Sequence, residues 1–158
     1  MAINPNTDFT SGAVLTADQM NRLPRGVMAR GVSSADYTLT TTLAQATGMS
    51  VTFTAVANRY YLVTYYEAQA QTPSVLGNTT IELRQTNATG TQLAQAVLVN
   101  ETAAIDQGNL MIVKTLTFTA GSVTLVGCAK TSSTTGGPSL IRSGNREALL
   151  LVEDIGPA

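Results

Sequence analysis

Apolar and polar residues alternate with a period of two over most of the chain from residue 37 onward. In residues 49–55, MSVTFTA, the large apolar side chains fall on one face of an extended chain, and serine and threonine fall on the other. The pattern recurs in residues 37–43, 81–84, 110–118 and 122–125. Such alternation is typical of antiparallel strands that have one buried and one solvated face.

Turn-forming residues separate these alternating segments at regular spacing, for example in residues 73–78, 87–90, 106–109 and 134–138. The spacing predicts eight or nine strands. We therefore expect an all-β fold in which residues 37–158 form an antiparallel β-sandwich or jelly roll.

The composition agrees with this fold. The chain of 158 residues contains 25 threonines and 10 serines, whereas charged residues make up only 12%, about half of the usual ~25%. Threonine suits strands because its branched β-carbon fits the pleated backbone. We interpret the threonine excess as the solvated surface of a sheet.

Two predicted strands are apolar on both faces: residues 60–66, YYLVTYY, and residues 148–152, ALLLV. Such strands are central in a sheet or are covered by a neighbouring subunit. The candidate residues for a subunit interface or the core are Tyr61, Tyr65, Leu149 and Leu151. The tyrosines could also stack on sugar rings, but neighbouring tyrosines point to both sides of a strand, which favours core or interface packing.

Residues 1–36 differ from the rest and predict a docking segment with one short helix at residues 16–23. Thr16 and Gln19 have capping-box spacing, Leu15 and Met20 match a hydrophobic staple, and Pro24 ends the helix. A helix this short is not stable alone, so it must pack against the sandwich or another subunit.

The residues predicted to dock this segment to a partner are apolar residues of the helix and three closely spaced arginines. The arginines are either solvated or pair with carboxylates of the partner, since arginine is frequent in interfaces. The set is Leu15, Met20, Arg22, Leu23, Arg25 and Arg30.

The composition excludes several kinds of chemistry. The chain has no histidine, so histidine triads and histidine-ligated metals are impossible, and its one cysteine, Cys128, allows no intrachain disulfide. It contains no nucleotide-binding or hydrolase motif, and the adjacent acids Glu153 and Asp154 would point to opposite faces of a strand. We expect no enzyme activity, catalytic residue, cofactor or metal.

Charge and hydropathy limit the partners in the same way. The net charge of −1 is unlike the clustered basic surface that binds nucleic acid. The beginning of the chain has no secretory signal pattern, and no apolar run approaches the ~20 residues that span a bilayer. We expect neither nucleic-acid binding nor membrane insertion, and synthesis and assembly in the cytoplasm.

Two end segments resemble small virion proteins of tailed bacteriophages, many of them minor tail proteins of phages that infect actinobacteria. They are residues 8–30, DFTSGAVLTADQMNRLPRGVMAR, and residues 148–157, ALLLVEDIGP. Residues 51–65 and 118–125 are similar to strands of the same group, so the resemblance covers nearly the whole chain.

The resemblance implies a trimeric jelly-roll head like tumour-necrosis-factor domains, with the last strand near the three-fold axis. It implies a non-enzymatic structural subunit of the virion surface, first of all a minor tail protein anchored by its N-terminal segment to other virion proteins. A capsid decoration protein of the same fold is the alternative. A module that binds carbohydrate on the host surface is the second alternative.

Overall fold

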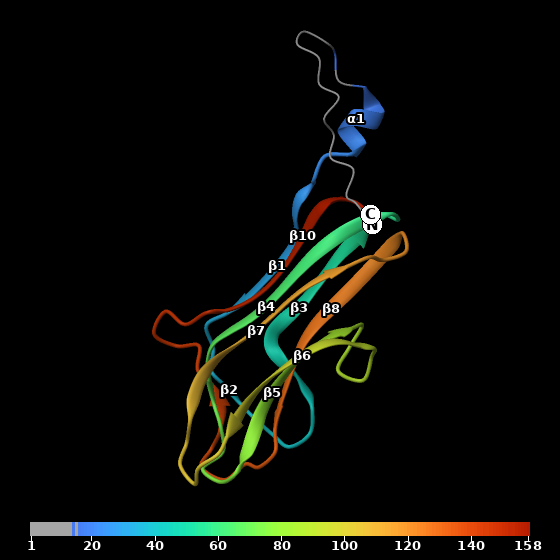
Figure 1. Ribbon diagram of the computed structural model, residues 1–158. Coiled ribbons are helices and arrows are strands. Elements are labelled where there is room, and N and C mark those ends of the chain that lie inside the picture. The colour runs from blue at the N-terminus through green and yellow to red at the C-terminus, as the bar shows by residue number, and fades with distance from the viewer. Residues whose placement is uncertain (1–13, 15) are drawn as a thin grey trace.

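The computed structural model describes residue 14 and residues 16–158. The strands run along the long axis of the molecule, and the short helix lies beyond one end, where the chain also terminates (Figure 1). The elements are α1 (Ala17–Asn21), β1 (Gly26–Ser33), β2 (Tyr37–Thr38), β3 (Ala44–Ala55), β4 (Arg59–Gln71), β5 (Gly77–Gln85), β6 (Gln92–Asn100), β7 (Gln107–Leu116), β8 (Gly121–Thr131), β9 (Ser139–Leu140) and β10 (Ala148–Pro157).

The strands form two antiparallel sheets. One has the order β1-β10-β4 with β7 on the other side of β4, and the two-residue strands β9 and β2 extend it at one end. The second has the order β3-β8-β5-β6. The chain crosses between the sheets at most connections, which gives the two interlocked Greek keys of a jelly roll. The predicted all-β sandwich with jelly-roll order is confirmed.

The core lies between the two sheets and follows from the period-two pattern. In β3, Met49, Val51 and Phe53 point inward and are at most 5% exposed, whereas the serine and threonines between them are exposed. The rings of Phe53, Tyr61 and Phe118 form a cluster near the α1 end, with centroids 5.2–5.8 Å apart. The alternation therefore assigns each strand its buried face.

The two doubly apolar strands are both central. β4 lies between β10 and β7, and β10 lies between β1 and β4. Their inward residues, such as Val63 and Leu150, are fully buried in the sandwich. Their outward residues alternate with these and lie on the opposite side of the sheet.

The N-terminal region differs from the expectation in its boundaries. The capping box is present, because Thr16 Oγ1 accepts from the Gln19 amide at 3.2 Å and the Gln19 side chain accepts from the Thr16 amide at 2.9 Å. The helix ends at Asn21 rather than at residue 23. Residues 26–33 are strand β1, which pairs with β10 over its whole length and therefore belongs to the sandwich.

Gly127 of β8 shows how closely the sheets approach. A Cβ atom at this position would lie 2.7 Å from Cζ of Tyr65, whose ring is fully buried. We expect Gly127→Ala to lower the free energy of unfolding by about 1–3 kcal/mol through overpacking. Urea denaturation measures this, with Ser122→Ala on the exposed face of β8 as the control. Equal stability of the two variants would contradict the packing described.

Candidate functional site

The most distinctive surface is the solvent side of the β1–β10–β4–β7 sheet, here called the outer face. The strand register places its residues in three rows that cross four strands. Eight of the twelve residues are apolar or aromatic, two are threonine and two are charged. The rows are Val32–Leu149–Tyr66–Met111, Arg30–Leu151–Thr64–Val113 and Val27–Glu153–Leu62–Thr115.

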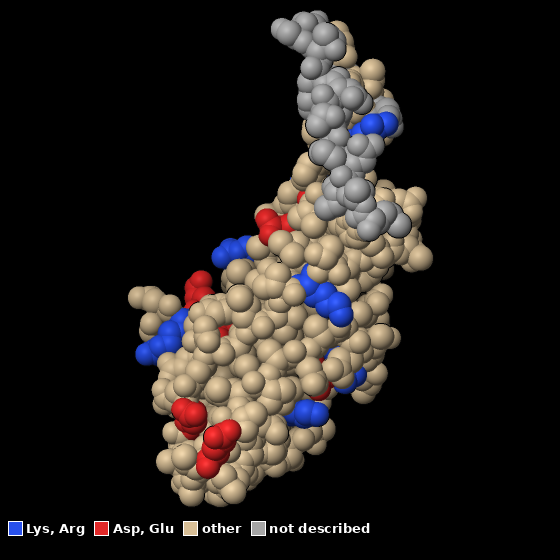
Figure 2. Space-filling model, in the orientation of Figure 1, with Lys and Arg blue, Asp and Glu red and all other residues tan. Residues whose placement is uncertain are grey.

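The described residues leave this face open. At its margins Val27, Val32, Met111 and Val113 are 41–59% exposed, whereas the central leucines and Tyr66 are partly buried by their neighbours. Contiguous exposed apolar patches are uncommon on soluble monomers and are typical of interaction surfaces. Most of the surface on the side of the molecule seen in Figure 2 carries no charged group.

The two charges on the outer face have opposite signs. Arg30 is exposed and lies in the row of Leu151, and Glu153 lies in the next row on the neighbouring strand. Within the described part of the chain neither side chain makes an ion pair or a hydrogen bond. The face therefore carries one unpaired cation and one unpaired anion within a mostly apolar surface.

The outer side of the second sheet has a different character. Its residues toward the α1 end are hydroxyl-bearing, and Thr52 and Thr124 hydrogen-bond each other at 2.8 Å. Farther along, Glu82 accepts from Arg84 Nε at 2.7 Å, and Lys130 lies 3.6 Å from its other oxygen. Polar groups on this side are thus paired locally. This side therefore differs from the outer face, on which Arg30 and Glu153 have no ion-pair partner within the described residues.

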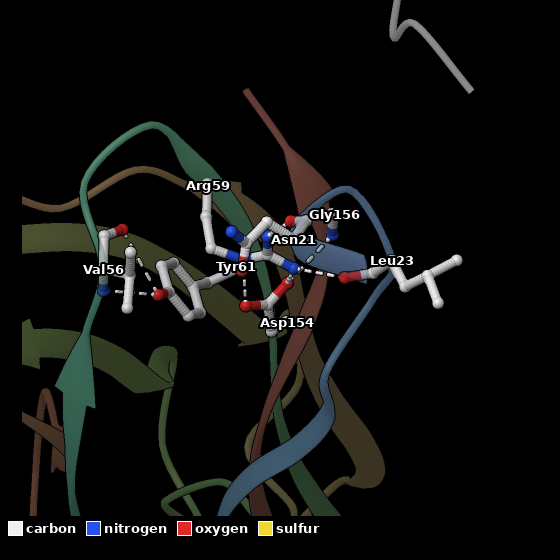
Figure 3. Close-up of polar contacts among 7 residues, drawn as sticks. All are labelled: Asn21, Leu23, Val56, Arg59, Tyr61, Asp154 and Gly156. Carbon is white, nitrogen blue, oxygen red and sulfur yellow. Dashed lines mark hydrogen bonds and ion pairs between the residues drawn. The ribbon is translucent and has the colours of Figure 1, made fainter. Parts of the chain in front are cut away.

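A buried ion pair fixes the N-terminal helix to the sandwich (Figure 3). Arg59, at the start of β4, and Asp154 of β10 are 4% and 1% exposed and form a two-pronged contact, with Nη2 and Oδ1 2.7 Å apart. The same guanidinium donates to the carbonyl oxygens of Asn21 and Leu23, each at 2.6 Å. Asn21 is the last residue of α1 and Leu23 follows it, and carbonyls at the end of a helix have no partner within the helix itself. We call this arrangement the latch.

The latch can be tested by removing its cation. Arg59→Leu leaves the Asp154 carboxylate buried without a counter-charge, so we expect the free energy of unfolding to fall by about 3–5 kcal/mol. The double variant Arg59→Leu/Asp154→Leu removes both charges and should recover part of this loss. Denaturant titration followed by circular dichroism measures both.

The matched control for the latch is Arg25→Leu. Arg25 is exposed and lies just outside α1, and replacement of such a surface residue changes stability by about 0.5 kcal/mol or less. A single Arg59 variant as stable as the control would show that the latch does not hold the helix.

A second buried ion pair involves Glu67, which lies farther along β4 than Arg59. Arg142 and Glu67 are fully buried, with Arg142 Nη2 and Nε 2.6 and 2.9 Å from the two carboxylate oxygens. Tyr65 donates its hydroxyl to Glu67 at 2.7 Å, and Arg142 also donates to the Thr47 carbonyl. Burial and the neighbouring Glu67 raise the pKa of Tyr65 well above its usual value. Each charged group of this cluster thus has hydrogen-bond partners inside the core.

Asp36 holds the segment that follows β9. Its Oδ1 accepts the amides of Arg142 and Ser143 at 2.7 and 2.8 Å, and these bonds lower the pKa of the carboxyl below its ordinary 3.8.

Because the folded pKa is the lower one, the stabilisation by Asp36 is present above pH 3.8 and is lost as the pH falls through the folded pKa. We expect Asp36→Asn to destabilise the protein at pH 7 and to have a smaller effect near pH 2. Thermal denaturation at both pH values measures this, and a difference that grows on acidification would contradict it.

The predicted docking residues do not lie together on one surface. Met20 is 52% exposed on α1, and Arg25 is exposed before β1. Arg22 and Leu23 are partly buried near the latch. Arg30 lies on the outer face, away from the helix. Leu15 lies outside the described residues.

The predicted interface or core residues divide by face. Tyr61 and Tyr65 point inward and are 0% exposed, so they are core residues and offer no stacking surface to a sugar. Leu149 and Leu151 point outward and form the centre of the outer face.

The ion-pair residues Arg59 and Arg142 were not found from the sequence, because nothing local distinguishes a buried arginine from a solvated one.

Other features add no chemistry. Among the described residues no three Cys, Asp or Glu side chains lie close enough to hold a metal ion, and no helix is long and apolar enough to span a membrane. Cys128 is buried, and burial raises its pKa to about 11. An open hollow at the α1 end is lined by Tyr60, Phe118 and Ala158.

Comparison with known proteins gives a likeness in structure and none in sequence family. No protein-family model matches the chain, and no curated protein matches it. Among solved structures it is similar to the Eiger TNF of S. frugiperda, at 14% sequence identity and a TM-score of 0.49. The match covers 85% of this chain and 96% of that one.

Proposed function

We propose that this chain is a non-enzymatic structural subunit that assembles with copies of itself through the outer face, forming a homotrimer on the surface of a tailed-phage virion. The observation that carries the self-association is the outer face itself. Leu149, Leu151 and Leu62 form a central apolar strip, and exposed valines and a methionine flank it. Covering such a surface releases about 25 cal/mol for each Å² of apolar area removed from water.

A second copy is the occupant that fits this face. The face carries one positive and one negative charge, Arg30 and Glu153, so it is complementary to another copy of itself. Most soluble oligomers are built from identical chains with closed symmetry. The number of three and the position of the last strand near the axis rest on the resemblance to phage proteins, and β10 does lie in the middle of the outer face.

The virion location also rests on the resemblance of residues 8–30 and 148–157, and the geometry at the α1 end supports an anchoring role. The latch holds the end of α1 against the sandwich through Arg59, so the helix is presented beyond the end of the molecule in a fixed direction (Figure 1). Met20 is exposed there and is available to another virion protein. A minor tail protein is the first assignment, and a capsid decoration protein remains the alternative.

The carbohydrate-binding alternative loses the residues on which it depended. Tyr61 and Tyr65 are fully buried, so they cannot stack on a sugar ring without unfolding. Tyr60 and Tyr66 are partly exposed on the opposite side of β4, and Tyr66 belongs to the outer face.

The self-association is tested by placing a charge on the outer face. We expect the wild-type chain to sediment as a trimer at micromolar concentration and Val113→Glu to be a folded monomer, because an unpaired carboxylate in an apolar interface is costly. The valine is 53% exposed, so the change should leave the stability of the single chain unaltered. Sedimentation equilibrium and circular dichroism measure the two properties.

The matched control is Thr54→Glu, which places the same charge on the exposed side of the second sheet and should remain trimeric. A monomeric wild-type chain would overturn the self-association. For the virion assignment, quantitative mass spectrometry of purified particles should detect a few trimers per virion. Copies in proportion to the major capsid protein would favour decoration instead.

A further inference from the structure

We propose that Arg30 and Glu153 form an ion pair between neighbouring copies and thereby fix how the outer faces meet. This inference rests on the proposed self-association and adds the residues that determine its register. Both residues lie on the outer face, on the adjacent strands β1 and β10, one row apart.

The proposed pairing follows first from burial. An interface that covers the central leucines also covers Arg30 and Glu153, because both lie beside Leu151 in the same or the next row. A charge removed from water must be paired, or it opposes association. Within the described part of the chain neither side chain makes an ion pair, so a counter-charge from the other copy would satisfy both.

No other residue of the outer face supplies a counter-charge for Arg30 or Glu153. The remaining members of the outer face are apolar residues and two threonines, which offer no charge. Stacking two faces so that arginine meets arginine would place like charges in a covered interface. The arrangement with Arg30 of one copy against Glu153 of the next satisfies every junction of a closed ring and equally satisfies a two-fold dimer. Charge pairs of this kind add specificity to an interface that is otherwise held by apolar contact.

Charge reversal tests the pair. R30E and E153R each place like charges at every junction, and we expect each to raise the dissociation constant of the oligomer by about tenfold or more. The double variant R30E/E153R restores opposite charges and should return the constant to near the wild-type value. Sedimentation equilibrium over a range of concentrations measures the constants, and circular dichroism verifies that each chain is folded.

The matched control is R25E. It makes the same change of charge at an exposed arginine that precedes β1 and lies off the outer face. We expect it to associate like the wild type. An equal loss in R25E would indicate a general effect of net charge and would overturn the pairing.

Mixing the single variants separates an effect between chains from one within a chain. If the pair forms between copies, an equimolar mixture of R30E and E153R associates more tightly than either alone, because mixed junctions regain opposite charges. In a two-fold dimer the mixture recovers fully. In a three-membered ring two variants cannot alternate, so one junction stays mismatched and recovery is partial. A mixture no tighter than its components would overturn the pairing between chains.

The outcomes distinguish this inference from the function on which it rests. A wild-type chain that is monomeric at all concentrations overturns both. A wild-type oligomer that Val113→Glu dissociates, but that R30E and E153R leave intact, retains the outer face as the interface and overturns the ion pair alone. A double variant as weak as the single variants also overturns the ion pair.

Discussion

Strands β4 and β10 carry apolar side chains on both faces, and much of the structure depends on this constraint. One set, including Val63 and Leu150, is buried between the sheets and drives the sandwich together. The other set lies on the outer face, where the chain supplies no cover within its described residues. The same two strands that form the centre of the core thus present an apolar surface outward. Folding buries the inward apolar residues of these strands, and the outward ones are the reason for the self-association that we propose.

β4 is also the strand from which both fully buried ion pairs arise. Arg59 at its first position pairs with Asp154, and Glu67 farther along pairs with Arg142. A one-residue slip of β4 would turn both inward charges to the opposite face and expose the core residues. The ion pairs therefore specify the register of the central strand, whereas apolar burial supplies most of the stability. The latch also positions the helix, because the Arg59 guanidinium donates to the carbonyls of Asn21, at the end of α1, and Leu23, just beyond it.

The sequence predicts the local features of this fold well. The two-residue period identified the buried face of β3, and the doubly apolar runs identified the two central strands. The capping box at Thr16 located the start of the helix. These features depend on residues close together in the chain, so one sequence is enough to find them.

The sequence could not predict features that depend on distant partners. Arg59 and Asp154 are 95 residues apart, and no local pattern distinguishes them from solvated charges. Residues 26–33 were assigned to the docking segment, although they form β1 and pair with the distant strand β10, with a register shift between Val27 and Ala29. Arg30 therefore looked like part of a basic docking cluster, although its pairing with Leu151 places it on the outer face.

The adjacent acids Glu153 and Asp154 connect the two functional regions. Neighbouring residues in a strand point to opposite sides, so Asp154 enters the buried latch while Glu153 faces outward. Just beyond them the register of β10 with β4 shifts between Asp154 and Gly156, and the Gly156 amide donates to Asp154 at 3.0 Å. The position of Asp154 in the latch therefore determines the row in which Glu153 lies. One short stretch of β10 thus determines both how the helix is attached and which row of the outer face carries the negative charge.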